Sequence, residues 1–121
     1  MRILVATKMY NDANRIIDTL TGYFEVRHAE SEWEVESELS NRDYSFLILD
    51  YELPQISGYK LLKELAEKGL LPSVVLVCGQ DAVGYNEDRL KALAYGKIQM
   101  IPVIDMDRAL REILLAYPEA A

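Results

Sequence analysis

Short runs of apolar residues, rich in β-branched side chains, recur five times along the chain and constrain its fold more than any other feature. They lie at residues 3–6, 24–27, 46–49, 74–78 and 98–103. Three of the runs are continuously hydrophobic and do not alternate with polar residues, which is typical of strands that helices cover on both faces of a sheet. The runs therefore predict five strands in a parallel sheet.

The segments between these runs carry the spacing of amphipathic helices. Apolar stripes lie at Ala13, Ile16, Ile17 and Leu20 in the first helix, and at Leu61, Leu62, Leu65 and Ala66 in the third. Gly69 is suited to end the third helix, because glycine is favoured just after a helix C-terminus. Asn86 and Gly96 predict the bounds of a fourth helix. Asp105 and Pro118 predict those of a fifth.

Residues 30–38 are ambiguous, because glutamates alternate there with other residues at a period of two that imitates a strand. A second helix is nevertheless predicted, since glutamate is poor in strands and Ser31 with Glu34 forms a capping box. Val35 and Leu39 are i,i+4 partners, and two parallel strands need a crossover connection here. The glutamates then form a solvated face, in which Trp33 is either a core residue or an exposed contact.

Five strands that alternate with helices, joined by right-handed crossovers, predict an α/β fold: a three-layer α/β/α sandwich with a flavodoxin-like parallel sheet in the strand order 2-1-3-4-5. A chain of 121 residues can bury one core of this kind but not two. We therefore expect residues 1–121 to form a single domain.

Charge and cysteine content exclude several classes of function. The net charge is −7, so neither nucleic acid nor an anionic membrane surface is an expected partner. Cys78 is the single cysteine, which excludes an internal disulfide and a zinc site of the usual composition. No apolar run approaches the length of a membrane span, and a cytoplasmic location is expected.

The predicted topology indicates where a site should lie. Open α/β sheets place sites beyond the carboxyl ends of the strands where the strand order reverses, here between the first and third strands. The residues at this point are Thr7, Lys8 and Asp50, of which Asp50 ends the buried run 46–49. His28, at the end of the second strand, has no expected role.

The segment Leu49-Asp50-Tyr51-Glu52-Leu53-Pro54, with Gly58 eight residues after the aspartate, resembles the receiver domains of bacterial two-component response regulators. The resemblance covers essentially the whole chain. It implies that Asp50 stands at the position of the aspartate that accepts a phosphoryl group. It also implies that Pro54 shapes the following loop and that Gly58 lies at the start of the third helix.

Four residues depart from the site that this resemblance implies. Thr7 and Lys8 stand where the family has an acidic pair that holds Mg²⁺. Cys78 stands at the serine or threonine position, and Ile101, before Pro102, at the lysine position. Because Mg²⁺ takes an octahedral shell of oxygen ligands, its binding is expected to be weak or absent, and no other metal or cofactor is expected.

Asp50 has three interpretations at this stage. As a hypothesis, the ammonium of Lys8 takes the place of the missing metal and pairs with Asp50. Alternatively, Asp50 caps the loop after its strand by accepting backbone N–H groups, and Lys8 is a solvated loop residue. In a working site, Glu52 would serve as a substitute acid. Cys78 is equally interpreted as a small core residue.

Three functions from different classes follow. The favoured one is an atypical receiver, or pseudo-receiver, that signals through protein contacts without Mg²⁺-dependent phosphorylation and has no enzymatic activity. Its expected partner is a histidine kinase, an output domain or another signalling protein, with a homodimer as a further option. The alternative is a receiver that accepts a phosphoryl group on Asp50 from a histidine kinase. The third is a flavodoxin-like ligand-binding domain, although the loop after the first strand has no glycines to hold a phosphate.

Overall fold

The computed structural model describes residues 2–7, 14, 17–20, 22, 24–50, 58–78, 99–103 and 106–116 of the chain. Its strands are β1 (Arg2–Ala6), β2 (Glu25–Ala29), β3 (Phe46–Asp50), β4 (Val74–Cys78) and β5 (Gln99–Val103). Its helices are α2 (Glu32–Asn41), α3 (Gly58–Glu67) and α5 (Met106–Ala116). Residues 17–20 are also helical, whereas the predicted helix from Asn86 to Gly96 lies outside the described residues, as do Asp105 and Pro118.

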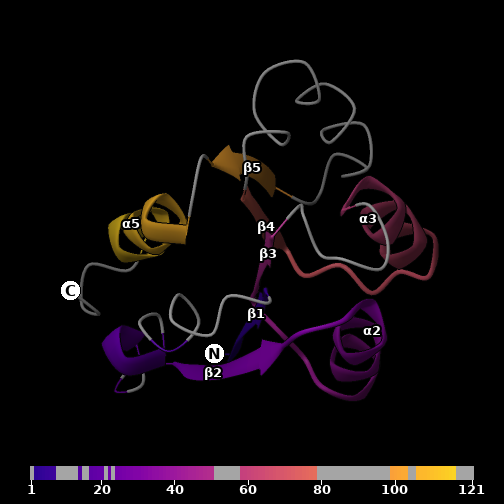
Figure 1. Ribbon diagram of the computed structural model, residues 1–121, viewed down its shortest axis with the longest axis horizontal. Coiled ribbons are helices and arrows are strands. Elements are labelled where there is room, and N and C mark those ends of the chain that lie inside the picture. Colours follow the sequence, from indigo (N-terminus) through magenta and orange to yellow (C-terminus); the bar gives the residue numbers. More distant parts are fainter. Residues whose placement is uncertain are drawn as a thin grey trace.

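The strands form one parallel sheet in the order β2-β1-β3-β4-β5, which confirms the predicted topology. In Figure 1, α2 and α3 cover one face of this sheet and α5 covers the other. The sheet and its two helical layers make the predicted α/β/α sandwich. Within the described residues, no helix is both long and apolar enough to cross a membrane.

Alternate residues of the strands enter two hydrophobic clusters, one on each face of the sheet. The cluster that includes residues of α2 and α3 takes from the strands Leu4, Ala6, Ala29, Leu47, Leu49, Val75 and Val77. The cluster that includes residues of α5 takes Ile3, Val5, Phe46, Ile48, Leu76 and Cys78. Burying one large aliphatic side chain contributes about 1.5–3 kcal/mol, so both faces favour apolar residues and the strands become continuous hydrophobic runs.

The second strand begins and ends later than the sequence pattern predicts. Residues 24–27 were the expected range, whereas β2 pairs with β1 from Arg2↔Glu25 to Ala6↔Ala29. Phe24 lies just before the strand, and its ring packs edge-on against Phe46 with 6.4 Å between the ring centroids. The apolar character of Phe24 therefore reflects core packing, while backbone pairing with β1 sets the limits of β2.

Helix α2 begins where the capping residues predict. Ser31 is its N-cap, and the Ser31 hydroxyl accepts a hydrogen bond of 3.2 Å from the backbone N–H of Glu34. The Glu34 carboxylate accepts from the N–H of Glu30 at 3.0 Å, one residue before the N–H that a standard capping box would use. Val35 and Leu39, the predicted i,i+4 partners, are both buried. Trp33 is 74% exposed, so it is a surface residue and not part of the core.

Helix α3 ends in a Schellman motif at the predicted glycine. The N–H of Leu70 donates to the carbonyl of Leu65 at 2.9 Å, and that of Gly69 donates to Ala66 at 3.1 Å. Gly69 has a φ of 68°, the left-handed conformation that this motif needs and that glycine adopts without steric cost. Leu70 then packs against the core cluster that contains Leu65, which fixes the exit of the chain toward β4.

Candidate functional site

The candidate site lies at the carboxyl ends of β1 and β3, where the sheet order reverses. Thr7 directly follows β1, and its backbone N–H donates to the carbonyl of Ala29 in β2 at 3.0 Å. Its side chain is fully buried, and its hydroxyl donates a hydrogen bond of 3.1 Å to Oδ2 of Asp50. The structure thus joins two of the predicted site residues in direct contact.

Asp50 is the last residue of β3 and remains partly exposed. Its register partner is Cys78, the last residue of β4, which is 3% exposed and belongs to the core cluster on the α5 side. Cys78 therefore has the core position that a small apolar residue would take, next to Asp50 in the sheet. The two residues end neighbouring strands at the same level, as the topology predicts.

Ile101 lies farther from this level than Thr7 and Cys78 do. It is the register partner of Leu76 in β4, whereas Val103 is the partner of Cys78. Because Asp50 is in register with Cys78, Val103 is the β5 residue level with the aspartate. Ile101 lies two residues closer to the amino end of the sheet, about 6.6 Å along the strand.

The remaining predicted residues divide into one that the structure places and three that it does not describe. Gly58 is the first residue of α3, where the resemblance puts it. Lys8, Glu52 and Pro54 lie outside the described residues, so the pairing of Lys8 with Asp50 stays a prediction.

His28 is the residue that sequence reasoning missed. Its Nε2 lies 2.5 Å from the backbone carbonyl oxygen of Thr7. A carbonyl oxygen only accepts, so Nε2 carries the proton and donates. His28 thereby holds the backbone of Thr7, whose hydroxyl in turn contacts Asp50. The predicted strand order could have indicated this contact, because it places the second strand beside the first, with its carboxyl end next to Thr7.

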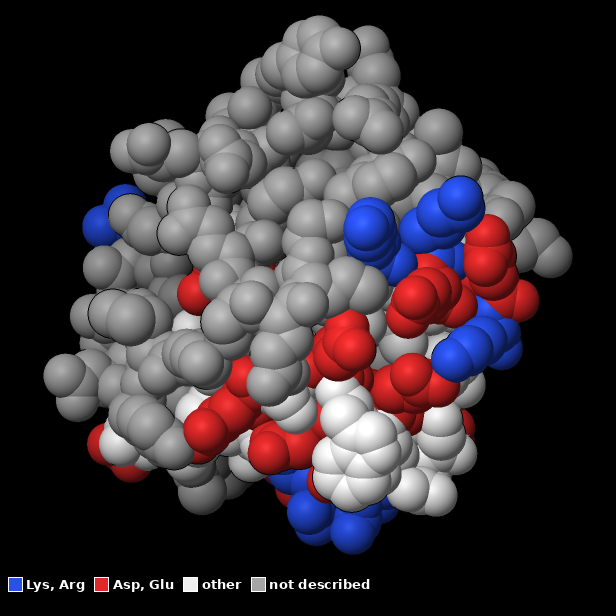
Figure 2. All heavy atoms as spheres, turned by 45° about the vertical axis from the view of Figure 1, so that its right-hand side comes forward, with Lys and Arg blue, Asp and Glu red and all other residues white. Residues whose placement is uncertain are grey.

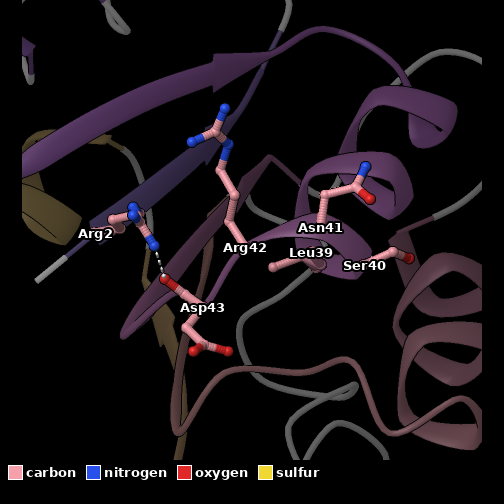
Figure 3. A pocket seen from close by; sticks show the side chains of 6 residues that line it. All are labelled: Arg2, Leu39, Ser40, Asn41, Arg42 and Asp43. Carbon is pink, nitrogen blue, oxygen red and sulfur yellow. Dashed lines mark hydrogen bonds between the residues drawn. The ribbon is translucent and has the colours of Figure 1, made fainter.

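A separate hollow of about 520 Å³ lies at the opposite, amino end of the sheet (Figure 3). Its lining residues are Arg2, Leu39, Ser40, Asn41, Arg42 and Asp43. The Arg2 guanidinium is engaged there, since Nε donates to Glu25 at 2.7 Å and Nη1 donates to the Asp43 carbonyl at 3.4 Å. This contact with Glu25 raises the pKa of Arg2 and lowers that of Glu25. Because this hollow lies at the end of the sheet opposite Asp50, it is separate from the candidate site.

Comparison with known proteins places this site in a family. The family model of the response regulator receiver domain matches residues 7–102, a range that begins at Thr7 and includes Asp50 and Cys78. The chain belongs to the response regulator receiver domain family. No curated protein sequence matches this receiver domain.

Solved structures with the same fold cover almost the whole receiver domain. The receiver domain of the Francisella response regulator 1452 is 19% identical, with a TM-score of 0.68, over 99% of this chain and 98% of that one. A CheY-like receiver domain protein from Methanospirillum hungatei is 18% identical, with a TM-score of 0.66, over 98% and 94%. Chemotaxis protein CheY4 of Vibrio cholerae is 13% identical, with a TM-score of 0.75, over 94% and 96%. At these identities the likeness concerns the fold.

Membership of the family raises the question of Mg²⁺ at Asp50. The described donors at this edge of the sheet are the Asp50 carboxylate, the Thr7 hydroxyl and the Cys78 thiol, and the hydroxyl directs its proton to Asp50. Among the residues that the structure describes, no three His, Cys, Asp or Glu side chains gather to hold a metal ion. The described donors alone do not make up the octahedral oxygen shell that Mg²⁺ takes.

Proposed function

We propose that this receiver domain is atypical and acts in signal transduction through protein–protein contacts, without Mg²⁺-dependent phosphorylation of Asp50. The observation that carries the proposal is the hydrogen bond from the buried Thr7 hydroxyl to Asp50 Oδ2, at 3.1 Å. A neutral hydroxyl stands there in the position that the family resemblance assigns to a metal-binding carboxylate.

The charge requirements of phosphoryl transfer support the same conclusion. A phosphoryl group brings nearly two negative charges at neutral pH, and its transfer depends on metal and lysine to neutralise them. The described groups beside Asp50 are a hydroxyl and a thiol, neither of which supplies positive charge. These two groups bring no charge of their own to neutralise a phosphoryl group, so a phosphorylated form would need a cation from elsewhere.

The remaining parts of the proposal concern the setting of the domain. We infer that residues 1–121 form one domain, that it acts in the cytoplasm, and that its partner is a histidine kinase, an output domain or another signalling protein. Pairing between Lys8 and Asp50 would neutralise the carboxylate without a metal and belongs to the same proposal. We also propose that the domain has no enzymatic activity, in keeping with its membership of the receiver domain family.

One observation favours the alternative function, a receiver that accepts a phosphoryl group. Asp50 ends β3 at the family position and remains partly exposed, so a phosphodonor could reach its carboxylate. The two functions differ in their need for Mg²⁺, because a phosphorylatable receiver has to bind the metal beside Asp50.

Mg²⁺ binding tests the proposal. We would titrate ¹⁵N-labelled protein with Mg²⁺ and follow the amide signals of Thr7 and Asp50, using Ca²⁺ to identify general screening of the acidic surface. The wild-type protein is expected to show no saturable shift, while Thr7→Asp, which restores one carboxylate, is the matched variant expected to gain one. A saturable Mg²⁺ shift at Asp50 of the wild-type protein would favour the phosphorylatable receiver.

A further inference from the structure

A hollow of about 300 Å³ lies beside α2 on the β2 side of the molecule, and of the residues described at the Asp50 site only His28 lines it. The residues around it are His28, Trp33, Glu34, Ser37 and Glu38. His28 comes from the edge strand β2 and the other four from α2. We call this hollow the α2 groove.

Trp33 forms an exposed apolar wall of the α2 groove. Its side chain is 74% exposed, although tryptophan is the largest side chain and usually buries most of its surface. Ser37 lies one helical turn further on the same face, and its small side chain leaves the flank of the indole open. The opposite side of α2 is the one that packs on the sheet, through Val35 and Leu39.

Negative charge surrounds the indole. Glu34 and Glu38 lie in the wall of the groove, and Glu30, Glu32 and Glu36 lie close by in the sequence. Figure 2 shows acidic side chains gathered on this side of the molecule, with basic side chains bordering them above, to the right and below.

These charges are only partly compensated. Glu36 pairs with Lys68, and Glu38 lies 3.6 Å from Arg42. Within the part of the chain that the structure describes, no ion pair joins Glu30, Glu32 or Glu34 to a cation. The groove therefore combines an exposed aromatic face with a local excess of negative charge.

We propose that the α2 groove docks an arginine-containing basic segment of a partner protein. A guanidinium stacks on an aromatic face and also pairs with carboxylates, so one arginine can contact the Trp33 indole and face Glu34 and Glu38 together. Such a contact combines the aromatic anchor and the charge complementarity that protein interfaces use for affinity and for fast association.

Charge complementarity also selects this occupant over others. A second copy of the chain carries a net charge of −7 and would bring the same acidic helix to the interface. Nucleic acid and anionic lipid would meet the same repulsion. The proposal does not depend on whether Asp50 accepts a phosphoryl group, because Asp50 is not among the lining residues.

The test uses the full chain and a short fluorescein-labelled peptide of alternating arginine and glycine, with binding measured by fluorescence anisotropy. Trp33→Ala is expected to weaken binding about five- to tenfold, the range of a single aromatic–cation contact with some burial. Leu115→Ala is the matched control, because Leu115 is 73% exposed on α5 and its loss should leave binding unchanged. Equal affinity of Trp33→Ala and the wild-type protein would overturn the proposal.

Two further arms separate arginine recognition from general attraction to an acidic protein. Glu34→Gln keeps the acceptor for the Glu30 N–H and removes one charge, whereas Glu112→Gln removes one charge on α5. Only Glu34→Gln should weaken binding, by about two- to fivefold. A peptide with citrulline in place of arginine keeps the shape without the charge and should not bind. Equal effects of the two Glu→Gln variants, or binding of the citrulline peptide, would contradict the proposal.

Trp33 itself provides a readout that needs no variant. It is the single tryptophan of the chain, so emission excited selectively at tryptophan, and not at the tyrosines, reports on the α2 groove alone. Unlabelled arginine peptide is expected to shift this emission to shorter wavelength as the indole is covered, and saturation should match the anisotropy curve. Peptide binding without a change in emission, or a dimer in sedimentation velocity that Trp33→Ala abolishes, would show that the occupant is a different one.

Discussion

The hydroxyl of Thr7 donates a hydrogen bond of 3.1 Å to Oδ2 of Asp50, and the backbone carbonyl of the same threonine accepts one from His28 at 2.5 Å. Thr7 therefore connects β2, β1 and β3 at the edge of the sheet where a receiver domain has its site. Because the threonine side chain is fully buried, this contact is a fixed part of the fold and orients Asp50.

Removing the Thr7 hydroxyl should lower stability. Thr7→Val keeps the shape of the side chain and leaves Asp50 without this donor. We expect the free energy of unfolding to fall by about 1–2 kcal/mol. Hydrogen bonds to charged groups are stronger than those between neutral groups, but this carboxylate is partly hydrated, which limits the loss. Urea unfolding at neutral pH measures the change. Thr7→Ser keeps the hydroxyl and should lose less. If Thr7→Val is as stable as the wild-type protein, the bond to Asp50 contributes nothing to the folded state.

The structure also predicts which tautomer His28 adopts. Since Nε2 donates to the Thr7 carbonyl, the neutral imidazole should carry its proton on Nε2. His28 is the single histidine of the chain, so long-range ¹H–¹⁵N correlation spectra recorded at alkaline pH report on it alone. Cross-peaks characteristic of the Nδ1–H tautomer would contradict the bond to Thr7.

Tyr44 should make the stability of the domain sensitive to alkaline pH. Burial, reinforced by the hydrogen bond of its hydroxyl to Glu38 at 2.5 Å, raises the pKa of Tyr44 well above its ordinary value of 10.0. The folded protein therefore keeps a proton that the unfolded chain releases, and this contribution to stability is complete below about pH 10 and is lost progressively as the pH rises above it.

The measurement is the free energy of unfolding between neutral and strongly alkaline pH for the wild-type protein and Tyr44→Phe. Tyr44→Phe should be less stable at neutral pH, because Glu38 loses its donor, and its stability should fall less steeply above about pH 10. Parallel profiles for the two proteins would show that Tyr44 ionises normally in the folded state.

A glycine pair tests the end of α3. Gly69 has a φ of 68° and open space around the position of an added Cβ, so the cost of Gly69→Ala is conformational and should be about 1–2 kcal/mol. Gly22 has equally open surroundings without a positive φ, and Gly22→Ala should be neutral or slightly stabilising. Urea unfolding compares the two variants. Equal losses of stability would mean that the left-handed conformation at Gly69 is not the reason for its glycine.

The sequence was most informative where a local pattern has one physical cause. Continuous apolar runs predicted buried strands, and Ser31 and Gly69 predicted the start of α2 and the end of α3 through contacts within a few residues. The contact of Thr7 with Asp50 joins residues 43 positions apart, and that of His28 with Thr7 spans 21 positions. Topology predicted that these strand ends meet, but hydrogen-bond partners depend on register and rotamers, which no periodicity encodes.

The difference between local patterns and contacts that depend on strand register also explains the shifted limits of β2 and the position of Ile101. The residues of β2 are Glu-Val-Arg-His-Ala, and a strand with so many polar residues has no hydrophobic run that marks its ends in the sequence. Its limits are set by backbone pairing with β1. In β5, the order of residues before Pro102 suggested Ile101, whereas the register places Val103 level with Asp50. Trp33 is a third example, because a single tryptophan among glutamates is compatible with core or surface until the helix is placed on the sheet.

Phosphorylation of Asp50 is the most direct test of the proposed function. The full chain would be incubated with acetyl phosphate and Mg²⁺ and its intact mass recorded beside Asp50→Asn, with a phosphorylatable receiver as positive control under the same conditions. We predict an unchanged mass for both forms of this protein while the control gains one phosphoryl group. A mass gain of one phosphoryl group in the wild-type protein that disappears in Asp50→Asn would contradict the account and establish Asp50 as a phosphoacceptor.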